Sequence, residues 1–414
     1  MKITEIECCR VCGSTSLEVI FDFGVQALST RFPGPDDPDA EQVPLTLTQC
    51  HHCKLVQLTH NYDLDDLYRR GYGYRSGVNQ TMRDHLGGIV TQLENYANLK
   101  TGDTVLDIAS NDGTLLAAYR EKGLNLVGID PTVAQYREYY PEGAHISPEF
   151  FTRDEFLRTS PTPSVKAISS IAVFYDVPDP ARFVEEIASC LEAEGVWVME
   201  QSYLPILVST LSFDSICHEH LGYYCLKQIE IVAEQAGLRV FHAETNDMNG
   251  GSIRAFLCHQ NAHFKTDTDS LSRLRELEQA ALLDDPETFR SFHKRVMGLG
   301  DQLVDLLKKE KAAGKSIHIY GASTKGNVLL QLFGIDASIV DAAAERNEWK
   351  FGHRTPGTNI PIISEAESRA QKPDYYLVLP WHFRDEFVKR EKEFMDNGGK
   401  LIFPLPEVEV YPNG

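Results

Sequence analysis

The sequence predicts an α/β protein in three parts: a small cysteine-rich module, a doubly wound parallel sheet, and a Rossmann-like domain at the end of the chain. Two observations predict it. Apolar runs alternate with helical stretches over most of the chain, as in parallel sheets. Five of the nine cysteines lie within the first 53 residues. At 414 residues the chain exceeds one ordinary hydrophobic core, so several domains are expected.

Composition narrows the class of protein. A hydrophobic content of 42% and a charged content of 24% are typical of globular proteins. The formal net charge of −20 disfavours nucleic acid and anionic membranes as partners. The first residues lack the pattern of a secretory signal, and no apolar run is long enough for a membrane span. We therefore expect a cytoplasmic protein without nucleic-acid or membrane partners.

The cysteine-rich module, residues 1–75, contains two CxxC pairs. Each pair presents two thiolates from one tight turn, and two pairs complete a tetrahedral zinc site with no open position. We expect a structural Zn²⁺ held by Cys9, Cys12, Cys50 and Cys53. Competing ligands are Cys8, His51 and His52. Four buried thiols without metal are the alternative.

Residues 76–268 contain the first series of expected strands, which cover 104–109, 124–130, 165–173, 195–202 and 252–258. In VLDIASNDGTLL (105–116), a buried strand leads through a small-residue turn into a helix, where backbone amides can face a ligand carboxylate. Asp130 ends the next strand, where an acid suits ribose hydroxyls. We expect a cofactor site formed by Asp107, Ala109, Asn111, Asp112, Gly113, Asp130 and Pro131.

The identity of this cofactor follows from the turn. An NAD-binding turn requires GxGxxG, of which two glycines are missing here. The turn instead resembles motif I of class I methyltransferases, which bind S-adenosylmethionine, although a glycine usually stands where Ala109 or Ser110 stands. A βαβ unit that merely buries an Asp is the alternative.

A polar cluster in SFDSICHEHLGYYCL (212–226) offers catalytic groups. One histidine can act as a general base, oriented by the other or by Glu219. A zincin helix is excluded because Gly222 stands where its second histidine belongs. The catalytic residues we expect from this cluster are His218, Glu219, His220 and Tyr224, and Tyr74 of the separate polar stretch 68–85 is a further candidate. A histidine that satisfies a core hydrogen bond is the alternative.

Residues 269–414 contain one or two connecting helices over 269–313, then strands expected at 316–323, 337–343, 374–380 and 400–406. The loop in IYGASTKGN (319–327) can hold a diphosphate with its amides and Lys325, and PWHF (380–383) can close the same crevice. A domain used only for packing is the alternative. The polar stretch 68–85 forms either a ligand cleft or a solvated linker.

The ordered motifs resemble a known family over nearly the whole chain. The CxxC pairs, YGYRSGVNQTM, VLDIASNDGTLL, SIAVFYDVPDP, MEQSYLP, ICHEHLGYY, NGGSIR and YGASTKGN occur in the order typical of sugar-nucleotide C-methyltransferases of deoxysugar biosynthesis. The resemblance implies a zinc-binding domain, a methyltransferase domain, and a C-terminal domain that helps hold a nucleotide sugar.

The resemblance also implies a reaction. The substrate would be a 4-keto-6-deoxyhexose linked to a nucleoside diphosphate, and the methyl group would go to the carbon beside the ketone. His220 would be the base, Glu219 would assist it, and Tyr74 would contact the substrate. The substrate-binding set expected with them is Tyr72, Ser76, Asn79, Asp176, Tyr223, Asn249, Gly321, Ser323, Lys325, Asn327 and His382. Three domains in one chain can complete this site, so a monomer is expected.

Two positions depart from the family pattern. Cys217 stands where better-known members carry Tyr, and Asp176 stands where they carry His. Both belong to the expected sugar site, so they leave open which sugar and which atom is methylated. The alternatives are an O- or N-methyltransferase, an epimerase that uses His220, and a zinc-dependent binding module with a degenerate enzyme domain.

Overall fold

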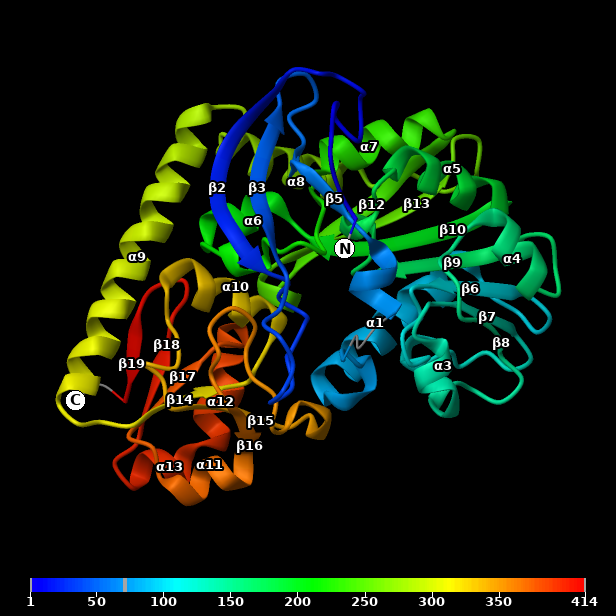
Figure 1. Ribbon diagram of the computed structural model, residues 1–414. Coiled ribbons are helices and arrows are strands. Elements are labelled where there is room, and N and C mark those ends of the chain that lie inside the picture. The colour runs from blue at the N-terminus through cyan, green and yellow to red at the C-terminus, as the bar shows by residue number, and fades with distance from the viewer. Residues whose placement is uncertain (1, 70–72, 413–414) are drawn as a thin grey trace.

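A computed structural model describes residues 2–69 and 73–412. At the N-terminal end it contains a small antiparallel sheet in the order β11-β4-β3-β2 (Figure 1). The strands of this region are β1 (Ile3–Glu5), β2 (Leu17–Ala27), β3 (Gln42–Cys50), β4 (Val56–Leu58), β5 (His60–Tyr62) and β11 (Gly222–Tyr223). The edge strand β11 comes from the middle of the chain, so this sheet is not formed by the first 75 residues alone.

The central sheet has seven strands in the order β12-β13-β10-β9-β6-β7-β8. Its strands are β6 (Thr104–Ile108), β7 (Asn125–Ile129), β8 (His145–Ser147), β9 (Val165–Ile171), β10 (Leu191–Ser202), β12 (Leu238–Asn246) and β13 (Ser252–His259). Its helices are α1 (Gln80–Ala97), α2 (Thr114–Ala117), α3 (Val133–Tyr136), α4 (Arg153–Thr159), α5 (Pro180–Cys190), α6 (Leu204–Ser209) and α7 (Leu226–Gln235). Pairings from β8 to β10 are parallel, whereas β12 and β13 run antiparallel.

This sheet is the doubly wound sheet that the sequence predicts. All five residues of β6 are buried, because helices cover both of its faces. The carboxyl ends of β6, β7, β9 and β10 therefore meet at one edge, where ligands bind in such sheets. The candidate site lies at this edge.

The connecting stretch forms two helices, α8 (Thr268–Ala280) and α9 (Pro286–Ala312). The break follows from local chemistry: Pro286 occupies the first turn of α9, and the Asp285 side chain accepts a hydrogen bond from the Glu287 amide. Helix α8 packs against β12, whereas α9 lies along β2 and α10, at the left of Figure 1.

The C-terminal sheet has six strands in the order β16-β15-β14-β17-β18-β19. Its strands are β14 (Ile317–Tyr320), β15 (Ala342–Glu345), β16 (Ile362–Ser364), β17 (Tyr375–Val378), β18 (Lys400–Phe403) and β19 (Glu409–Tyr411). Its helices are α10 (Thr324–Phe333), α11 (Glu365–Gln371), α12 (Arg384–Arg390) and α13 (Lys392–Asp396). The strand expected at 337–343 is wrong in position: the Asp336 carboxylate accepts from the Ser338 amide and turns the chain, so β15 starts only at Ala342.

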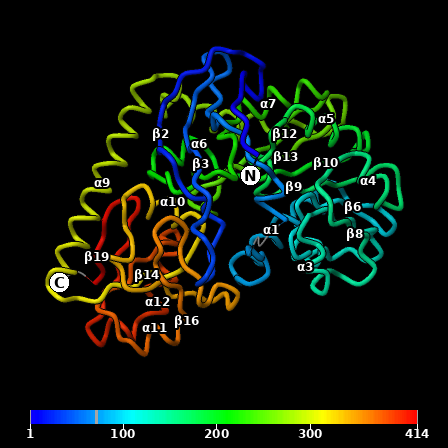
Figure 2. The backbone as a smooth tube through the Cα atoms, in the orientation of Figure 1, coloured from blue at the N-terminus to red at the C-terminus, as the bar shows by residue number. Residues whose placement is uncertain are grey.

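The N-terminal module does not have a core of its own. One hydrophobic cluster joins Phe21 and Leu45 of its sheet to Phe213 of the catalytic stretch, to Leu303 of α9 and to Val328 of α10. Figure 2 shows the blue N-terminal strands running between the green middle and the yellow-to-red end of the chain. The three regions are therefore packed into one body.

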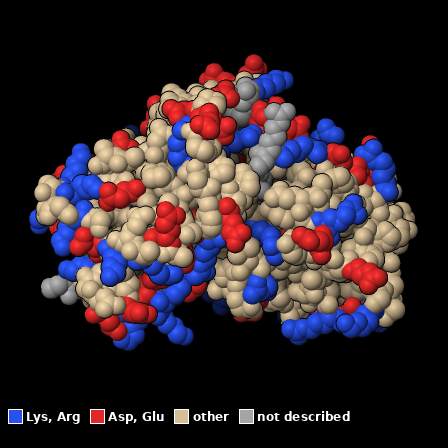
Figure 3. Space-filling model, turned by 60° about the horizontal axis from the view of Figure 1, so that its bottom comes forward, with Lys and Arg blue, Asp and Glu red and all other residues tan. Residues whose placement is uncertain are grey.

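The surface carries mixed charge. On the face shown in Figure 3, basic and acidic side chains are interspersed, without one extended patch of either sign. Among the described residues, no helix combines the length and the apolar character needed to cross a membrane.

Candidate active site

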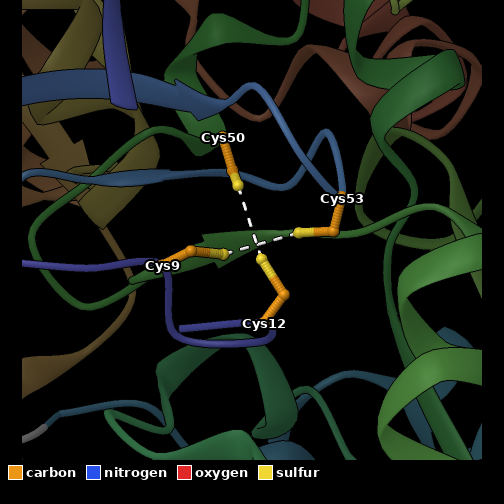
Figure 4. A group of neighbouring side chains, drawn as sticks. All are labelled: Cys9, Cys12, Cys50 and Cys53. Carbon is orange, nitrogen blue, oxygen red and sulfur yellow. Dashed lines mark hydrogen bonds between the residues drawn. The ribbon is translucent and has the colours of Figure 1, made fainter. Parts of the chain in front are cut away.

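The four cysteines of the CxxC pairs converge on one point (Figure 4). Their sulfur atoms all lie within 4.8 Å of one another, and the Cys9–Cys53 and Cys12–Cys50 sulfur pairs are 3.5 Å apart. Tetrahedral zinc with Zn–S bonds of about 2.3 Å requires sulfur separations of roughly 3.8 Å. The residues therefore fit a zinc ion with all four positions filled by protein, which is the pattern of a structural site.

The two CxxC turns have the same backbone geometry. Gly13 and Lys54, which follow the second cysteine of each pair, both have positive φ, and their amides donate to the carbonyls of Cys9 and Cys50 at 2.9 Å. Of the competing ligands, His51 lies instead beside Glu18 at 3.3 Å. Within the described part of the chain, the metal-binding group consists of the four cysteines alone.

The expected cofactor loop lies at the carboxyl edge of the central sheet, between β6 and α2. Ala109, Asn111 and Gly113 all have positive φ, so the loop is tightly coiled. A methyl group added at Gly128 of β7 would lie within 2.8 Å of the Ser110 hydroxyl, which shows how closely β7 approaches the loop. The left-handed conformation of Ala109 explains why glycine usually stands at this point of motif I.

Acidic groups surround this loop. Asp130, at the end of β7, accepts from the Asn111 amide at 3.0 Å and from the Thr132 amide at 2.6 Å, across the half-buried Pro131. Burial raises the pKa of Asp130 and raises that of Asp107 to about 7. Asp107 accepts from the Ser169 hydroxyl at 2.7 Å, below the loop. These residues fit a cofactor whose ribose hydroxyls reach the end of β7.

The stretch 73–79 lies directly on the cofactor loop, which the sequence did not predict. Arg75 Nε and the Gly77 amide both donate to Asp112 at 3.0 Å. The Asn111 side chain donates to the Tyr74 carbonyl at 3.1 Å and accepts from the Ser76 amide at 2.9 Å. Residues 73–79 are therefore packed against the cofactor loop, and a role in ligand binding for this stretch stays a prediction.

The other residues predicted in this stretch are Tyr74, Asn79 and Tyr72. The Tyr74 side chain is 49% exposed. Asn79 caps α1 by accepting from the Thr81 amide at 2.9 Å. Tyr72 lies outside the described residues. A role in substrate binding stays a prediction for all three.

The HEH motif lies on a loop just before β11. His218 is 1% exposed, and its Nε2 lies 3.4 Å from the Val43 carbonyl. The Glu219 carboxylate accepts from the Ser29 and Thr30 hydroxyls at 3.2 and 2.7 Å. Both side chains therefore point into the N-terminal module, and the geometry gives no hydrogen bond from Glu219 to His220 within the described residues.

His220 is oriented differently. Its Nδ1 lies 2.7 Å from the Ser215 carbonyl oxygen, which only accepts, so Nδ1 carries the proton and Nε2 keeps its lone pair. The Tyr175 ring packs on the imidazole at 4.1 Å between centroids. Burial and the charge of Lys325 lower the pKa of His220 to about 4. At neutral pH this histidine is an unprotonated imidazole, the form that accepts a proton.

The C-terminal domain contributes charge to the same place. Lys325 of α10 donates to the Asn249 carbonyl at 2.7 Å, and Asn249 has positive φ. Burial and Lys325 lower the pKa of His382 to about 3. Trp381 donates to the Asp214 carboxylate at 2.9 Å, beside the HEH loop. The PWHF turn and the NGGSIR turn thus both meet the catalytic stretch.

Several buried polar atoms in this region have no partner among the described residues: Asp176 Oδ1, both amide atoms of Gln201, Asp214 Oδ1 and His382 Nδ1. The unpaired Tyr224 hydroxyl lies instead near Arg10 and Cys9. A buried polar atom without a hydrogen bond costs about 1–3 kcal/mol. Such a concentration indicates a site prepared for a polar ligand. Burial also raises the pKa of Asp176, which favours its neutral, hydrogen-donating form.

The sequence reasoning missed Gln201. It is 2% exposed at the carboxyl end of β10, next to the end of β9. Its place in MEQSYLP, directly after the buried run of a strand, was the available signal. The same strand carries Glu200 on its other face, where the carboxylate contacts His85 at 2.5 Å and Arg254 at 2.8 Å.

Apart from Tyr223 of β11, the remaining predicted residues lie around the loop after β14. Gly321 has positive φ, and a methyl group there would lie 2.9 Å from Pro380. Ser323 caps α10 by accepting from the Gly326 amide at 3.0 Å. Asn327 is fully buried and donates to the Ser29 carbonyl at 2.7 Å. Tyr223 is buried, with its hydroxyl 3.5 Å from the Ser215 carbonyl.

Comparison with known proteins gives three family matches in chain order. They are described as "Putative zinc binding domain" over residues 9–68, "Methyltransferase domain" over 79–243 and "C-methyltransferase C-terminal domain" over 247–406. The C-methyltransferase NovU of Streptomyces niveus is 30% identical over 99% of this chain and 97% of its own length.

Two solved structures resemble part of the chain. The PH0226 protein of Pyrococcus horikoshii OT3 is 14% identical, with a TM-score of 0.36 over 47% of this chain and 99% of its own. The 1,6-didemethyltoxoflavin-N1-methyltransferase of Burkholderia thailandensis is 11% identical, with a TM-score of 0.34 over 44% of this chain and 80% of its own.

The full-length relative and the three ordered matches agree with the zinc-binding module, the doubly wound sheet and the C-terminal domain described above. The chain belongs to the family of S-adenosylmethionine-dependent C-methyltransferases that combine a zinc-binding domain, a methyltransferase domain and a C-methyltransferase C-terminal domain.

Proposed function

We propose that this C-methyltransferase acts on a 4-keto-deoxysugar linked to a nucleoside diphosphate, and that His220 is its base. The observation that carries the proposal is the state of His220: its Nδ1 is fixed by the Ser215 carbonyl, and its pKa is lowered to about 4. The unprotonated Nε2 is then available to remove a proton from carbon.

The chemistry of a ketone fits this base. A carbon beside a carbonyl is acidic because the enolate places the negative charge on oxygen. His220 takes the proton at Nε2 while Lys325, whose charge opposes protonation of the imidazole, favours the enolate oxygen. Bound S-adenosylmethionine would supply the electrophilic methyl group.

The nucleotide half of the substrate is assigned to the C-terminal domain. The loop between β14 and α10 places Gly321 and Ser323 at the carboxyl end of a parallel strand, where phosphates bind in such folds, whereas Lys325, whose charge acts on His220, is assigned to the ketone oxygen. Asp176, Tyr223 and the turn at Asn249 would contact the sugar. We also propose that the boundaries between the three domains lie at residues 75 and 268. The enzyme is proposed to be monomeric and cytoplasmic.

The test is incubation with S-adenosylmethionine and a panel of dTDP-4-keto-6-deoxyhexoses in D₂O, followed by NMR of the products. We expect a new methyl signal on the carbon beside the ketone. We also expect deuterium at that carbon when S-adenosylmethionine is omitted. His220→Asn should abolish both.

Other outcomes would replace the proposal. A methyl group on oxygen or nitrogen would establish the O- or N-methyltransferase alternative. Deuterium uptake with an inverted centre and no methyl transfer would indicate an epimerase. No reaction with any member of the panel, by an enzyme that binds S-adenosylmethionine, would reject this substrate class.

A further inference from the structure

The N-terminal module holds the chain on both sides of His220. His218 and Glu219, before it, contact Val43, Ser29 and Thr30 of the module. After it, Gly222 and Tyr223 form β11, which pairs with β4. The His220 side chain, in contrast to those of His218 and Glu219, points toward Ser215.

Arg10 links the zinc site to these contacts between the N-terminal module and residues 218–223. It lies between Cys9 and Cys12, and its guanidinium donates to the Leu58 carbonyl at 2.7 Å, the His60 carbonyl at 3.0 Å and the Asn61 side chain at 2.7 Å. The Gln57 side chain accepts from both the Arg10 amide and Nη1. One side chain inside the CxxC turn thus fixes the path of β4 and β5.

The connection continues to the catalytic loop through a single residue. Leu58, whose carbonyl accepts from Arg10, donates its amide to the Leu221 carbonyl at 2.9 Å. Leu221 follows His220 directly and donates its own amide to the Tyr175 carbonyl at 2.7 Å. The Tyr175 ring in turn packs on the His220 imidazole.

We propose that Arg10 is a positioning residue: through β4 and Leu221, it holds His220 in the orientation required of the base. A zinc ion held by the four cysteines would fix the turn that carries Arg10, and in this way would influence the position of His220. His220 is the base only under the proposed function, whereas the hydrogen-bonded link from Arg10 to Leu221 does not depend on that function.

The role of Arg10 depends on its shape. A planar guanidinium reaches several acceptors at fixed angles, which a lysine ammonium does not reproduce. An error of about 1 Å in the placement of a catalytic group lowers the rate by up to about 100-fold. Loss of Arg10 should therefore loosen the loop and lower kcat more than it changes KM.

The experiment compares Arg10→Met, Arg10→Lys and the control His51→Ala in the zinc-loaded full-length protein. His51 is exposed in the other CxxC turn and lies beside Glu18 of β2, so its loss controls for disturbance of a zinc turn. The measurements are zinc content, hydrogen–deuterium exchange over residues 215–223, and the NMR titration of the His220 imidazole. Neither loop measurement requires a substrate.

For Arg10→Met with zinc retained, we expect exchange over 215–223 to accelerate by about tenfold or more, with unchanged exchange in β6 and β9. The His220 titration should move toward the ordinary histidine value as the loop opens to water. Arg10→Lys should lie between, and His51→Ala should match the wild type.

Wild-type exchange and an unchanged His220 titration in zinc-loaded Arg10→Met would overturn the proposal. If Arg10→Met does not retain zinc, Arg10→Lys decides by the same criteria. A loop loosened as expected, in a protein that methylates none of the keto sugars, would contradict the proposed function and leave the positioning role of Arg10 supported.

Discussion

The cofactor loop and the catalytic loop are built in opposite ways. The cofactor loop, 109–113, is built within the methyltransferase region: strand, turn and helix follow one another, and its outside contacts come from Asp130 after the adjacent strand and from residues 74–77 just before α1. The loop that contains the proposed base, residues 217–223, depends on distant parts of the chain. Strands of the N-terminal module hold it, the nearby Ser215 carbonyl orients His220, and the charge of Lys325 from the C-terminal domain acts on His220.

This difference in construction separates the binding of S-adenosylmethionine from the rate of the methylation step. A local loop can bind a cofactor whenever the central sheet is folded. A loop assembled from three regions acquires its geometry only when all three are in place. Changes in the first loop should therefore alter affinity for S-adenosylmethionine, whereas changes around the second should alter the rate.

The largest expected effect is at the base. His220→Asn should lower kcat by about 10²- to 10⁴-fold, the usual contribution of a general base, and leave the affinity for S-adenosylmethionine within about threefold. Steady-state kinetics and calorimetry measure the two quantities. The matched control is His242→Asn on β12, where the histidine pairs with Asp267. A comparable loss in both variants would contradict a specific role for His220.

Asp130→Ala should weaken binding of S-adenosylmethionine by about 10- to 100-fold, because a charged hydrogen-bonding group is lost. Calorimetric titration of the folded, zinc-loaded protein measures it. Asp154→Ala, an exposed acid in the first turn of α4, is the control. Unchanged affinity in Asp130→Ala would remove this residue from the cofactor site.

Gln201→Met tests whether the unpaired Gln201 amide destabilises the ligand-free protein. It should stabilise the fold, whereas the control substitution should destabilise it. Removing a buried group that has no partner should raise the free energy of unfolding of the ligand-free protein by about 1–3 kcal/mol. The same change should weaken ligand binding. Gln228→Met is the control, because that equally buried amide donates to the Cys53 carbonyl at 2.7 Å. Denaturant unfolding should show destabilisation there, and the same sign in both variants would reject the interpretation.

The pH dependence of stability should differ between wild type and His220→Asn. The unfolded histidine takes up a proton near pH 6.5, whereas the folded one does so near pH 4. The wild type should therefore lose stability relative to the variant as the pH falls through this window, by about 1–2 kcal/mol for a half-buried group. Buried carboxyls such as Asp107 titrate in the opposite sense but are common to both proteins. A constant difference between pH 7 and pH 4 would contradict the lowered pKa.

The smallest effect concerns Ala109. Its φ of 59° is strained for an alanine and free for a glycine. Ala109→Gly should change the free energy of unfolding by no more than about 1 kcal/mol, because relief of strain is offset by greater freedom of the unfolded chain. Denaturant unfolding checks it. A loss of several kcal/mol would mean that the alanine methyl packs against a neighbour.

The same contrast explains how much the sequence could predict. Strands β6, β7 and β9, the cofactor loop and the four cysteines follow from residues close in sequence, through strand periodicity, small-residue turns and CxxC spacing. The position of β15 was wrong because Asp336 forms a turn whose strength depends on its hydrogen bonds. The strand β12 was not predicted at all.

The catalytic stretch was predicted only in part. HEH beside a tyrosine pair indicated an acid–base cluster, but not that His218 and Glu219 face Val43 and Thr30 while His220 faces Ser215. Those directions are set by contacts between residues more than a hundred positions apart in the first two cases. Gln201 was missed for the same reason: an unpaired amide is visible only when its surroundings are known.

The two-residue strand β11 has a consequence for building hybrid enzymes. Because residues 222–223 complete a sheet that otherwise belongs to the first 60 residues, a swap of the N-terminal segment between relatives exchanges three strands and leaves the fourth behind. A hybrid that takes residues 204–226 together with the N-terminal segment from the same donor keeps the pairing of β11 with β4 intact. The same pairing constrains the evolution of both segments. Compensating substitutions should therefore be sought between the N-terminal strands and the residues around β11.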